Sequence, residues 1–234
     1  MLDNVISHFV SQFHANFIAE DRWKILLSGL GVTLEVTLFA LIIGIVLGFV
    51  VAIIRATHDQ TGRLRIANAV AKVYTTVIRG TPVVVQLLII YFVIFSSVNI
   101  SKVVVAVLAF GLNSGAYVSE IVRSGIMSID IGQLEAGRSL GFNYTKTMIY
   151  IIMPQAFKNV LPALGNEFIT LLKETSVAGY IALQDLTKAG DLIRSRTFSA
   201  FMPLIAVALI YLGMVGFFTW LLGKLERRLR DSER

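Results

Sequence analysis

The chain has 234 residues, of which 56% are hydrophobic and only 15% are charged, and its mean hydropathy is +0.75. A soluble domain of this length is nearer to half apolar and a quarter charged, so the composition indicates membrane segments. The chain has no cysteine, which excludes disulfides and thiolate metal sites, and its net charge of +6 is typical of membrane-flanking loops rather than of nucleic-acid binding.

The first predicted element is an amphipathic N-terminal segment, residues 1–24. Val5, Phe9, Phe13 and Phe17 recur every four residues between polar side chains. This spacing places the four side chains on one face of a helix. Such a helix either lies in the membrane interface or packs as an ordinary helix against the rest of the chain.

Five apolar segments follow, each of about twenty residues or more, enough to cross a hydrocarbon layer of about 30 Å at about 1.5 Å per residue. They cover approximately residues 25–54, 70–98, 103–122, 160–183 and 198–222. We therefore predict an all-α fold, a polytopic transmembrane helical bundle of about five spans within residues 25–223. A basic cytoplasmic tail, residues 224–234, completes the chain.

The basic residues predict the orientation of this bundle, because cytoplasmic loops carry an excess of Lys and Arg. Of the 21 Lys and Arg residues, fourteen fall in cytoplasmic segments if the C-terminus is inside. Six fall in outer segments, and Lys173 lies within a span. The distribution favours an N-out, C-in topology.

A long amphipathic stretch, residues 124–158, separates the third and fourth spans and is too polar to cross a membrane. Within it, residues 133–140 can form a short helix that ends at Gly141, a residue suited to a left-handed C-cap. A helix parallel to the bilayer that exposes Phe142 and Tyr144 suits the docking of a soluble partner. The alternative is an interfacial loop that has no partner.

The same stretch carries a spaced motif whose members are Glu135, Ala136, Gly141, Ile151 and Pro154. It resembles the cytoplasmic signature of permease subunits of ATP-binding-cassette importers: Glu-Ala-Ala, three residues, Gly, nine residues, Ile, one residue, Leu-Pro. Two positions depart from this signature, since Gly137 replaces the second alanine and Met153 the leucine.

Further motifs resemble the polar amino-acid branch of these type I permeases, the histidine/glutamine/arginine permease-like family. They are Arg79-Gly-Thr-Pro82 with Gln86-Leu87, Asn113-Ser-Gly-Ala-Tyr117-Val-Ser-Glu120, Asn166-Glu-Phe-Ile169 and Leu172-Lys-Glu-Thr-Ser176. Together with the cytoplasmic motif they stand in the expected order, and the resemblance as a whole covers about residues 26–223.

The resemblance implies a subunit in the bacterial cell (inner) membrane that moves a polar amino acid inward by alternating access. It implies a second permease copy or a sister permease, two cytoplasmic ATPase subunits and an extracellular or periplasmic substrate-binding protein as partners. Glu135, Ala136, Gly141, Phe142 and Pro154 would then couple the chain to the ATPase.

We expect that this chain is not an enzyme and binds no cofactor. It contains no Gly-x-x-x-x-Gly-Lys-[Ser/Thr] phosphate loop, so ATP and Mg would bind to the partner ATPase.

Polar groups inside the spans need partners or a function, because a charge at the membrane centre costs about 2.5–3.5 kcal/mol. The candidate substrate-binding residues are Asn113, Tyr117, Asn166 and Glu167. Their alternative role is hydrogen bonding between helices. Glu120 is predicted to pair with Arg123, three residues further along the same helix.

Glu167 is the candidate contact for the positive charge of a cationic amino acid. Lys173 lies less than two turns away and could neutralise Glu167 instead, and an external binding protein could set the selectivity. Two other functions stay open. One is an ion-coupled secondary amino-acid carrier, which inverted internal repeats would favour although none is evident. The other is a membrane scaffold without transport activity.

Overall fold

The computed structural model describes residues 2–231, and every regular element among them is helical. The elements are α1 (Leu2–Phe13), η1 (His14–Ile18), η2 (Ala19–Asp21), α2 (Trp23–Thr61), α3 (Arg65–Gly80), α4 (Val83–Ile89), η3 (Ile90–Ile94), α5 (Lys102–Met127), α6 (Ile131–Ser139), α7 (Tyr144–Thr147), η4 (Met148–Ile152), α8 (Met153–Glu174), η5 (Thr175–Ile181), α9 (Leu186–Thr197) and α10 (Phe201–Asp231). The prediction of an all-α fold is confirmed for this part of the chain.

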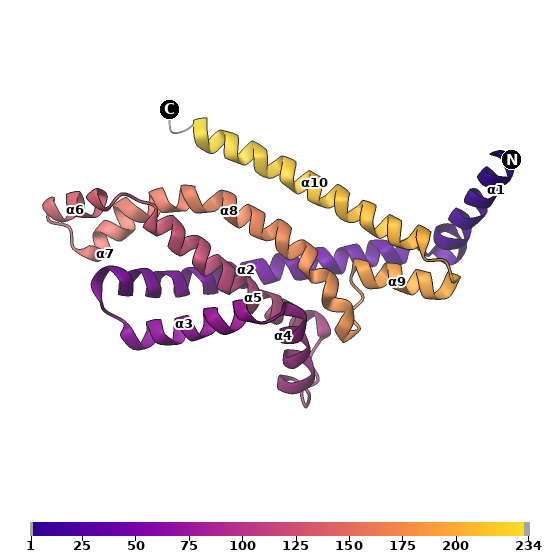
Figure 1. The fold of residues 1–234 in the computed structure, drawn as a ribbon, viewed down its shortest axis with the longest axis horizontal. Helices are drawn as coiled ribbons and strands as arrows, with labels where there is room; N and C mark the ends of the chain where they lie inside the picture. Colours follow the sequence, from indigo (N-terminus) through magenta and orange to yellow (C-terminus); the bar gives the residue numbers. More distant parts are fainter. Residues whose placement is uncertain (1, 232–234) are drawn as a thin grey trace.

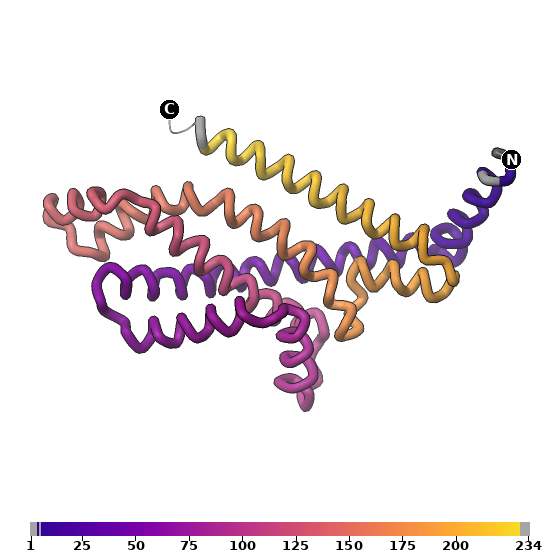
Figure 2. Tube along the Cα trace, viewed as in Figure 1, coloured from indigo at the N-terminus to yellow at the C-terminus, as the bar shows by residue number. Residues whose placement is uncertain are grey.

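Long helices lie beside one another and give the molecule two distinct ends (Figure 1). One end, here called the α6 end, holds α6, α7 and the turn between α2 and α3. The opposite end, the α9 end, holds α9, the start of α2 and the start of α10, with α1 projecting from it. The trace in Figure 2 shows that α10 runs from the α9 end toward the α6 end. The short helices of residues 128–152 therefore lie at one extremity of the bundle.

Three helices of the described chain, α2, α5 and α10, are long and apolar enough to cross a membrane. A fourth span is formed if α3 and α4 count as one segment, which is bent by 108° at Thr81 and Pro82. The predicted fourth segment, residues 160–183, lies in α8 and η5, which do not meet the same test among the described residues. Charged and amide side chains interrupt its apolar run, so five spans remains a prediction.

The contact between α2 and α5 is made by small residues that recur every four positions on α2. These are Ala40, Gly44, Gly48, Ala52 and Ala56, all buried. A Cβ atom at Gly44 would lie 2.8 Å from the Ser114 Oγ, and one at Gly48 would lie 2.5 Å from the Val118 side chain. A stripe of small residues lets two backbones approach closely, which stabilises helix pairs in membranes.

Three apolar clusters hold α4, α8, α9 and α10 on this pair. The first joins α2, α4, α5 and η5 around Phe110 and Leu87, and the second joins α2, α5 and α8 around Ile126 and Ile152. The third joins η1, α2, α9 and α10 around Leu186 and Val207. The bundle therefore has a core along its whole length.

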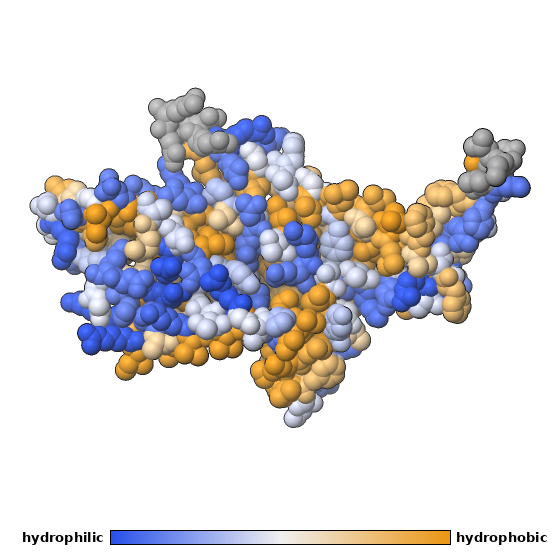
Figure 3. Space-filling view, viewed as in Figure 1, coloured by the Kyte–Doolittle hydropathy of each residue, from blue (hydrophilic) through white to orange (hydrophobic). Residues whose placement is uncertain are grey.

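Much of the apolar surface outside these clusters is exposed, above all on α10 and α4. Leu209, Leu212 and Phe217 on α10 are exposed, as is Phe92 after α4. Figure 3 shows these apolar surfaces in orange, with hydrophilic residues gathered toward the α6 end. Exposed apolar surface of this extent is expected where lipid replaces water as the solvent.

The N-terminal segment divides at η1. Phe9 and Phe13 are exposed on α1, whereas Phe17 is buried against Leu26 and Ile193. The side chain of Val5 lies outside the described residues. The sequence predicts that the segment either lies in the membrane interface or packs against the rest of the chain. Its last part, η1, packs against the bundle, whereas α1 has an exposed aromatic face.

Candidate functional site

The bend between α3 and α4 is built by Pro82 and stabilised by Gln86. Pro82 has no backbone N–H, so the helix cannot continue through it and carbonyl groups near the break lose their partners. The Gln86 amide nitrogen donates to the carbonyl of Ile78 at 2.7 Å and to the carbonyl and hydroxyl of Thr81 at 3.0 and 2.8 Å. One buried side chain thus satisfies a broken helix inside the apolar bundle.

Asn113 of α5 holds this break from the other side. Its amide nitrogen donates to the Gln86 Oε1 atom at 3.0 Å, and only 2% of the residue is exposed. The Asn113 Oδ1 atom is buried without a hydrogen-bond partner in the described structure. Tyr74 of α3 adds a hydrogen bond from its hydroxyl to the carbonyl of Leu112 at 2.6 Å. Buried polar groups therefore meet at the middle of α5.

Glu167 reaches the same level of α5 from α8. The Ser114 hydroxyl donates to Glu167 Oε1 at 2.7 Å. Ser114 is fully buried and Glu167 half-buried. No ion pair joins Glu167 to Lys173, whose side chain is exposed. The described structure thus places the carboxylate against a hydroxyl of a neighbouring helix and leaves the lysine apart from it.

Tyr117 lies one turn along α5 from Asn113, on the same face. It is 37% exposed, and the Arg79 guanidinium lies 5.4 Å from the centre of its ring. A guanidinium over an aromatic face at this distance is a cation–π contact. Tyr117 thereby connects the polar centre of α5 to the charged residues nearer the α6 end.

Asn166 is the one predicted substrate residue that the structure does not bring to α5. It is exposed, and its amide nitrogen donates to the carbonyl of Pro162 in its own helix at 3.2 Å. Adjacent helix positions are about 100° apart, and here Glu167 contacts Ser114 of α5 whereas Asn166 is exposed. Asn113, Tyr117 and Glu167 gather on α5, and Asn166 points elsewhere.

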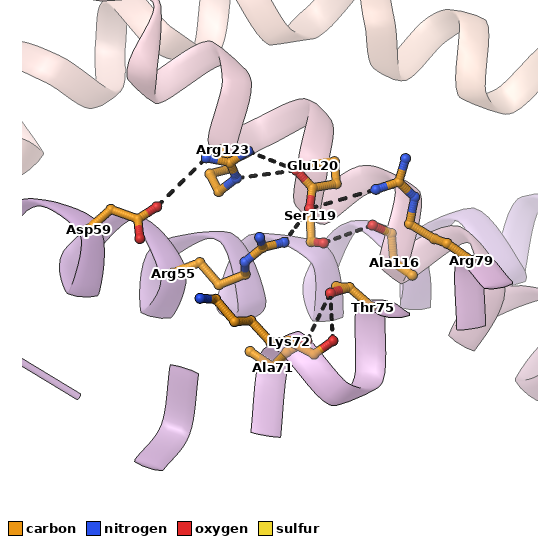
Figure 4. A network of polar contacts seen from close by, with 10 residues as sticks. All are labelled: Arg55, Asp59, Ala71, Lys72, Thr75, Arg79, Ala116, Ser119, Glu120 and Arg123. Atoms are coloured by element: carbon orange, nitrogen blue, oxygen red, sulfur yellow. Dashed lines mark hydrogen bonds and ion pairs between the residues drawn. The ribbon is translucent and has the colours of Figure 1, made fainter. Parts of the chain in front are cut away.

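A charge network follows the polar centre along α5, on the side of the α6 end, and Figure 4 shows its side chains. Glu120 accepts a hydrogen bond from Arg55 of α2, pairs with Arg123 at 3.1 Å and lies 3.7 Å from Arg79 of α3. Arg123 also lies 3.6 Å from Asp59 of α2. One carboxylate therefore ties three helices together.

The predicted ion pair between Glu120 and Arg123 is confirmed. It could be predicted because two residues three positions apart on a helix are neighbours. Sequence reasoning missed Arg55 and Arg79 as partners of Glu120. It likewise missed Ser114 as the partner of Glu167 and Gln86 as the partner of Asn113. The only available signal was the presence of polar residues in apolar segments, which does not indicate the partner.

The connecting segment at the α6 end begins with an N-cap. Asp130 accepts a hydrogen bond from the Gly132 backbone N–H at 2.6 Å, which starts α6. Its end is a Schellman motif: Phe142 N–H donates to the Gly137 carbonyl at 3.0 Å and Gly141 N–H to the Arg138 carbonyl at 2.9 Å. Gly141 has φ +83°, so the predicted left-handed cap is confirmed.

The predicted coupling residues lie along the exposed side of this segment. Glu135, Ala136, Gly141 and Phe142 are exposed, and Pro154 is exposed at the start of α8. The prediction that Phe142 and Tyr144 are both exposed is wrong for Tyr144. It is half-buried against the second apolar cluster, and this burial raises the pKa of its phenol.

Gly137 shows why the second alanine of the motif is replaced. A Cβ atom there would lie 2.6 Å from Thr147 Cγ2 and 3.1 Å from Ile151 Cδ1. Thr147 is fully buried, so it has little room to move. The missing side chain allows α6 to pack directly on α7 and η4.

No group of three or more His, Cys, Asp or Glu side chains in the described structure could hold a metal ion.

Known proteins resemble this chain along most of its length. Residues 44–231 match the family described as binding-protein-dependent transport system inner membrane component. The arginine transport system permease protein ArtQ of Bacillus subtilis is 40% identical over 210 residues, which cover 89% of this chain and 94% of that protein. The glutamine transport system permease protein GlnP of Escherichia coli is 41% identical over 168 residues, covering 70% and 77%. A crystal structure of an amino acid ABC transporter with histidines matches with a TM-score of 0.81 and 42% identity, covering 91% of this chain and 98% of that one.

Proposed function

The chain belongs to the family of binding-protein-dependent transport system inner membrane components, and we propose that it moves a polar amino acid into the cell by alternating access, driven by ATP hydrolysis on partner subunits. The observation that carries this proposal is the pairing of two features on α5. Its middle gathers the buried polar residues, and its end leads into the capped, exposed helix α6.

A partner that moves α6 would act on the polar centre through α5. Met127, the last residue of α5, is separated from Ile131, the first of α6, by three residues. Glu120 ties α5 to α2 and α3 between those two sites. A shift of α6 would therefore be transmitted to several helices, as alternating access requires. The ATPase would dock on the exposed side of α6, with the membrane oriented so that this end is cytoplasmic.

Glu35 supports the proposal that a second copy or a sister permease completes the transporter. It is an exposed carboxylate on α2, about 18 Å along the helix from Trp23. Leu38 and Phe39 beside it are exposed and apolar. A carboxylate that faced hydrocarbon at this depth would be costly. A second permease, or an aqueous pathway between two permeases, would remove that cost.

The polar amino acid would contact Asn113, Tyr117 and Glu167, and a positive side chain would favour Glu167. Relatives named for arginine and for glutamine are similar to this chain to nearly the same degree, so their names do not select between the two substrates. The Glu167 carboxylate supports a cationic amino acid, because unlike charges attract strongly when partly desolvated.

The ion-coupled carrier is less well supported, since the relatives are named transport system permease proteins and the similar solved structure is of an amino acid ABC transporter. The test is purification of the chain from its native membrane together with its bound subunits, followed by reconstitution into liposomes. We expect a cassette ATPase to co-purify and uptake of amino acid to require ATP and an external binding protein. Uptake driven by an ion gradient, with no ATPase bound, would contradict the proposal.

A further inference from the structure

An apolar groove of about 690 Å³ lies between α2, α8 and α10. Leu41, Ile45 and Phe49 of α2 line one side of it, and Phe157 and Leu161 of α8 line another. The groove is separate from the polar centre, because none of Asn113, Tyr117 and Glu167 lines it.

The inner part of the groove is closed where α10 touches α8. The rings of Phe168 and Phe218 meet edge to face, with centroids 4.8 Å apart. Leu222 is buried against Gly165, where any Cβ atom would collide with it. The groove therefore has a firm wall along α10 rather than a loose gap.

The length of the groove matches one leaflet of a bilayer. Its α8 wall extends from Phe157 to Ile169, which is about 18 Å of helix. One leaflet of a hydrocarbon core of about 30 Å is about 15 Å deep. An acyl chain lying along α8 would fill the groove.

Two cations stand at the end of the groove that is nearer the α6 end. Lys224 and Arg228 line it together with Leu221 and Leu225, since positions 221, 224, 225 and 228 share one face of α10. The Lys224 Nζ atom lies 3.7 Å from the ring centre of Trp220, which is exposed. Among the side chains that the structure describes, no carboxylate pairs with Lys224 or Arg228. The groove is thus apolar along its length and positive at one end.

We propose that this groove binds a phospholipid with an anionic headgroup. One acyl chain lies between α8 and α10, and the phosphate contacts Lys224 and Arg228. A basic pocket between transmembrane helices is the arrangement that recognises anionic headgroups. The apolar walls alone would accept any acyl chain or a helix of a second copy, whereas the two cations select the anionic lipid. The ligand would connect α10 to α8 and α2.

The experiment uses the full chain with its co-purifying subunits in nanodiscs of equal parts phosphatidylglycerol and phosphatidylethanolamine. Native mass spectrometry counts the lipids of each class that stay bound. The test variant is Lys224→Gln/Arg228→Gln. The matched control is Arg63→Gln/Arg65→Gln, which removes the same charge at the turn between α2 and α3, away from the groove.

We expect the wild type and the control to retain phosphatidylglycerol in preference to phosphatidylethanolamine. The test variant should bind phosphatidylglycerol about thirtyfold more weakly, because each cation near a membrane surface contributes about fivefold. Leu161→Trp, which fills the groove, should reduce the binding of both lipids. Equal retention by the test variant and the wild type would overturn the proposal. The proposal would also be overturned if Leu161→Trp lost the second permease copy and kept its lipid, because the groove would then be an interface between permeases.

Discussion

Arg55 of α2 donates a hydrogen bond to the carboxylate of Glu120 of α5, 65 residues further along the chain. Both side chains are largely buried, with 14% and 22% of their surfaces exposed. The pair lies beside the small-residue contact of the same two helices, where Ala52 and Ala56 are fully buried. The close packing of α2 on α5 therefore fixes the distance at which the two charges meet.

Glu120→Gln should destabilise the protein by about 2 kcal/mol, because the loss of a charged hydrogen bond leaves Arg55 and Arg79 without a carboxylate partner and Arg123 with Asp59 alone. The measurement is the midpoint of thermal unfolding in detergent. Glu135→Gln, an exposed carboxylate on α6, is the control and should change the midpoint little. Equal midpoints for Glu120→Gln and wild type would show that the network has no net stabilising role.

Gly137→Ala should lower stability by about 1–3 kcal/mol, although alanine is the better helix former by about 1 kcal/mol. The reason is the approach of its Cβ atom to Thr147, at 2.6 Å. Thermal unfolding and protease sensitivity of residues 131–152 both report the effect. Gly216→Ala in α10, where a Cβ atom meets nothing within 4 Å, should be neutral or stabilising. A stabilised Gly137→Ala variant would mean that α6 and α7 are not packed as described.

Gly141→Val should uncouple transport from ATP hydrolysis. A β-branched residue at φ +83° is strained by about 1–2 kcal/mol, so the end of α6 would be displaced. We expect severalfold losses in transport and in substrate-stimulated ATP hydrolysis, with normal insertion into the membrane. Leu140→Val is the neighbouring control, since Leu140 is exposed with φ −78°. Wild-type activities in Gly141→Val would argue against docking at α6.

The topology can be tested with tags at both ends of the chain. A reporter fused after Arg234 should be cytoplasmic, and an accessible tag placed before Leu2 should lie outside, because fourteen of the 21 basic residues fall on the predicted inner side. Detection of both tags on the same side would require an even number of spans. In that case α8 or the bent pair of α3 and α4 would not cross the membrane.

Glu167→Gln should weaken the preference for cationic amino acids by about tenfold, the loss that about 1.4 kcal/mol of charge attraction would cause. The measurement is competition of labelled arginine uptake by lysine, histidine, glutamine and glutamate. Ser114→Ala is the matched control, because it removes the hydrogen bond to Glu167 and keeps the charge. Asn166→Ala should have little effect, since its amide is bonded within α8. Unchanged selectivity in Glu167→Gln would exclude this carboxylate as the selective contact.

The sequence by itself determined those features that depend on neighbours a few positions apart. Helix geometry places Arg123 one turn from Glu120 and sets Asn113 and Tyr117 on one face. The left-handed conformation at Gly141 follows from the one residue type that adopts it at no steric cost. Long apolar runs likewise marked α2, α5 and α10 as candidate spans.

Only the tertiary structure decided which helices meet and at what register. Gln86 with Asn113, Ser114 with Glu167 and Arg55 with Glu120 are pairs between residues that lie 27, 53 and 65 positions apart. The register is set by the close approach of α2 and α5 at Gly44 and Gly48, and a hydropathy pattern does not encode which small residue faces which neighbour. The exposure of Asn166 and the groove beside α10 likewise depend on how the helices pack against one another. Local periodicity therefore specified the helices, and contact between their surfaces specified the site.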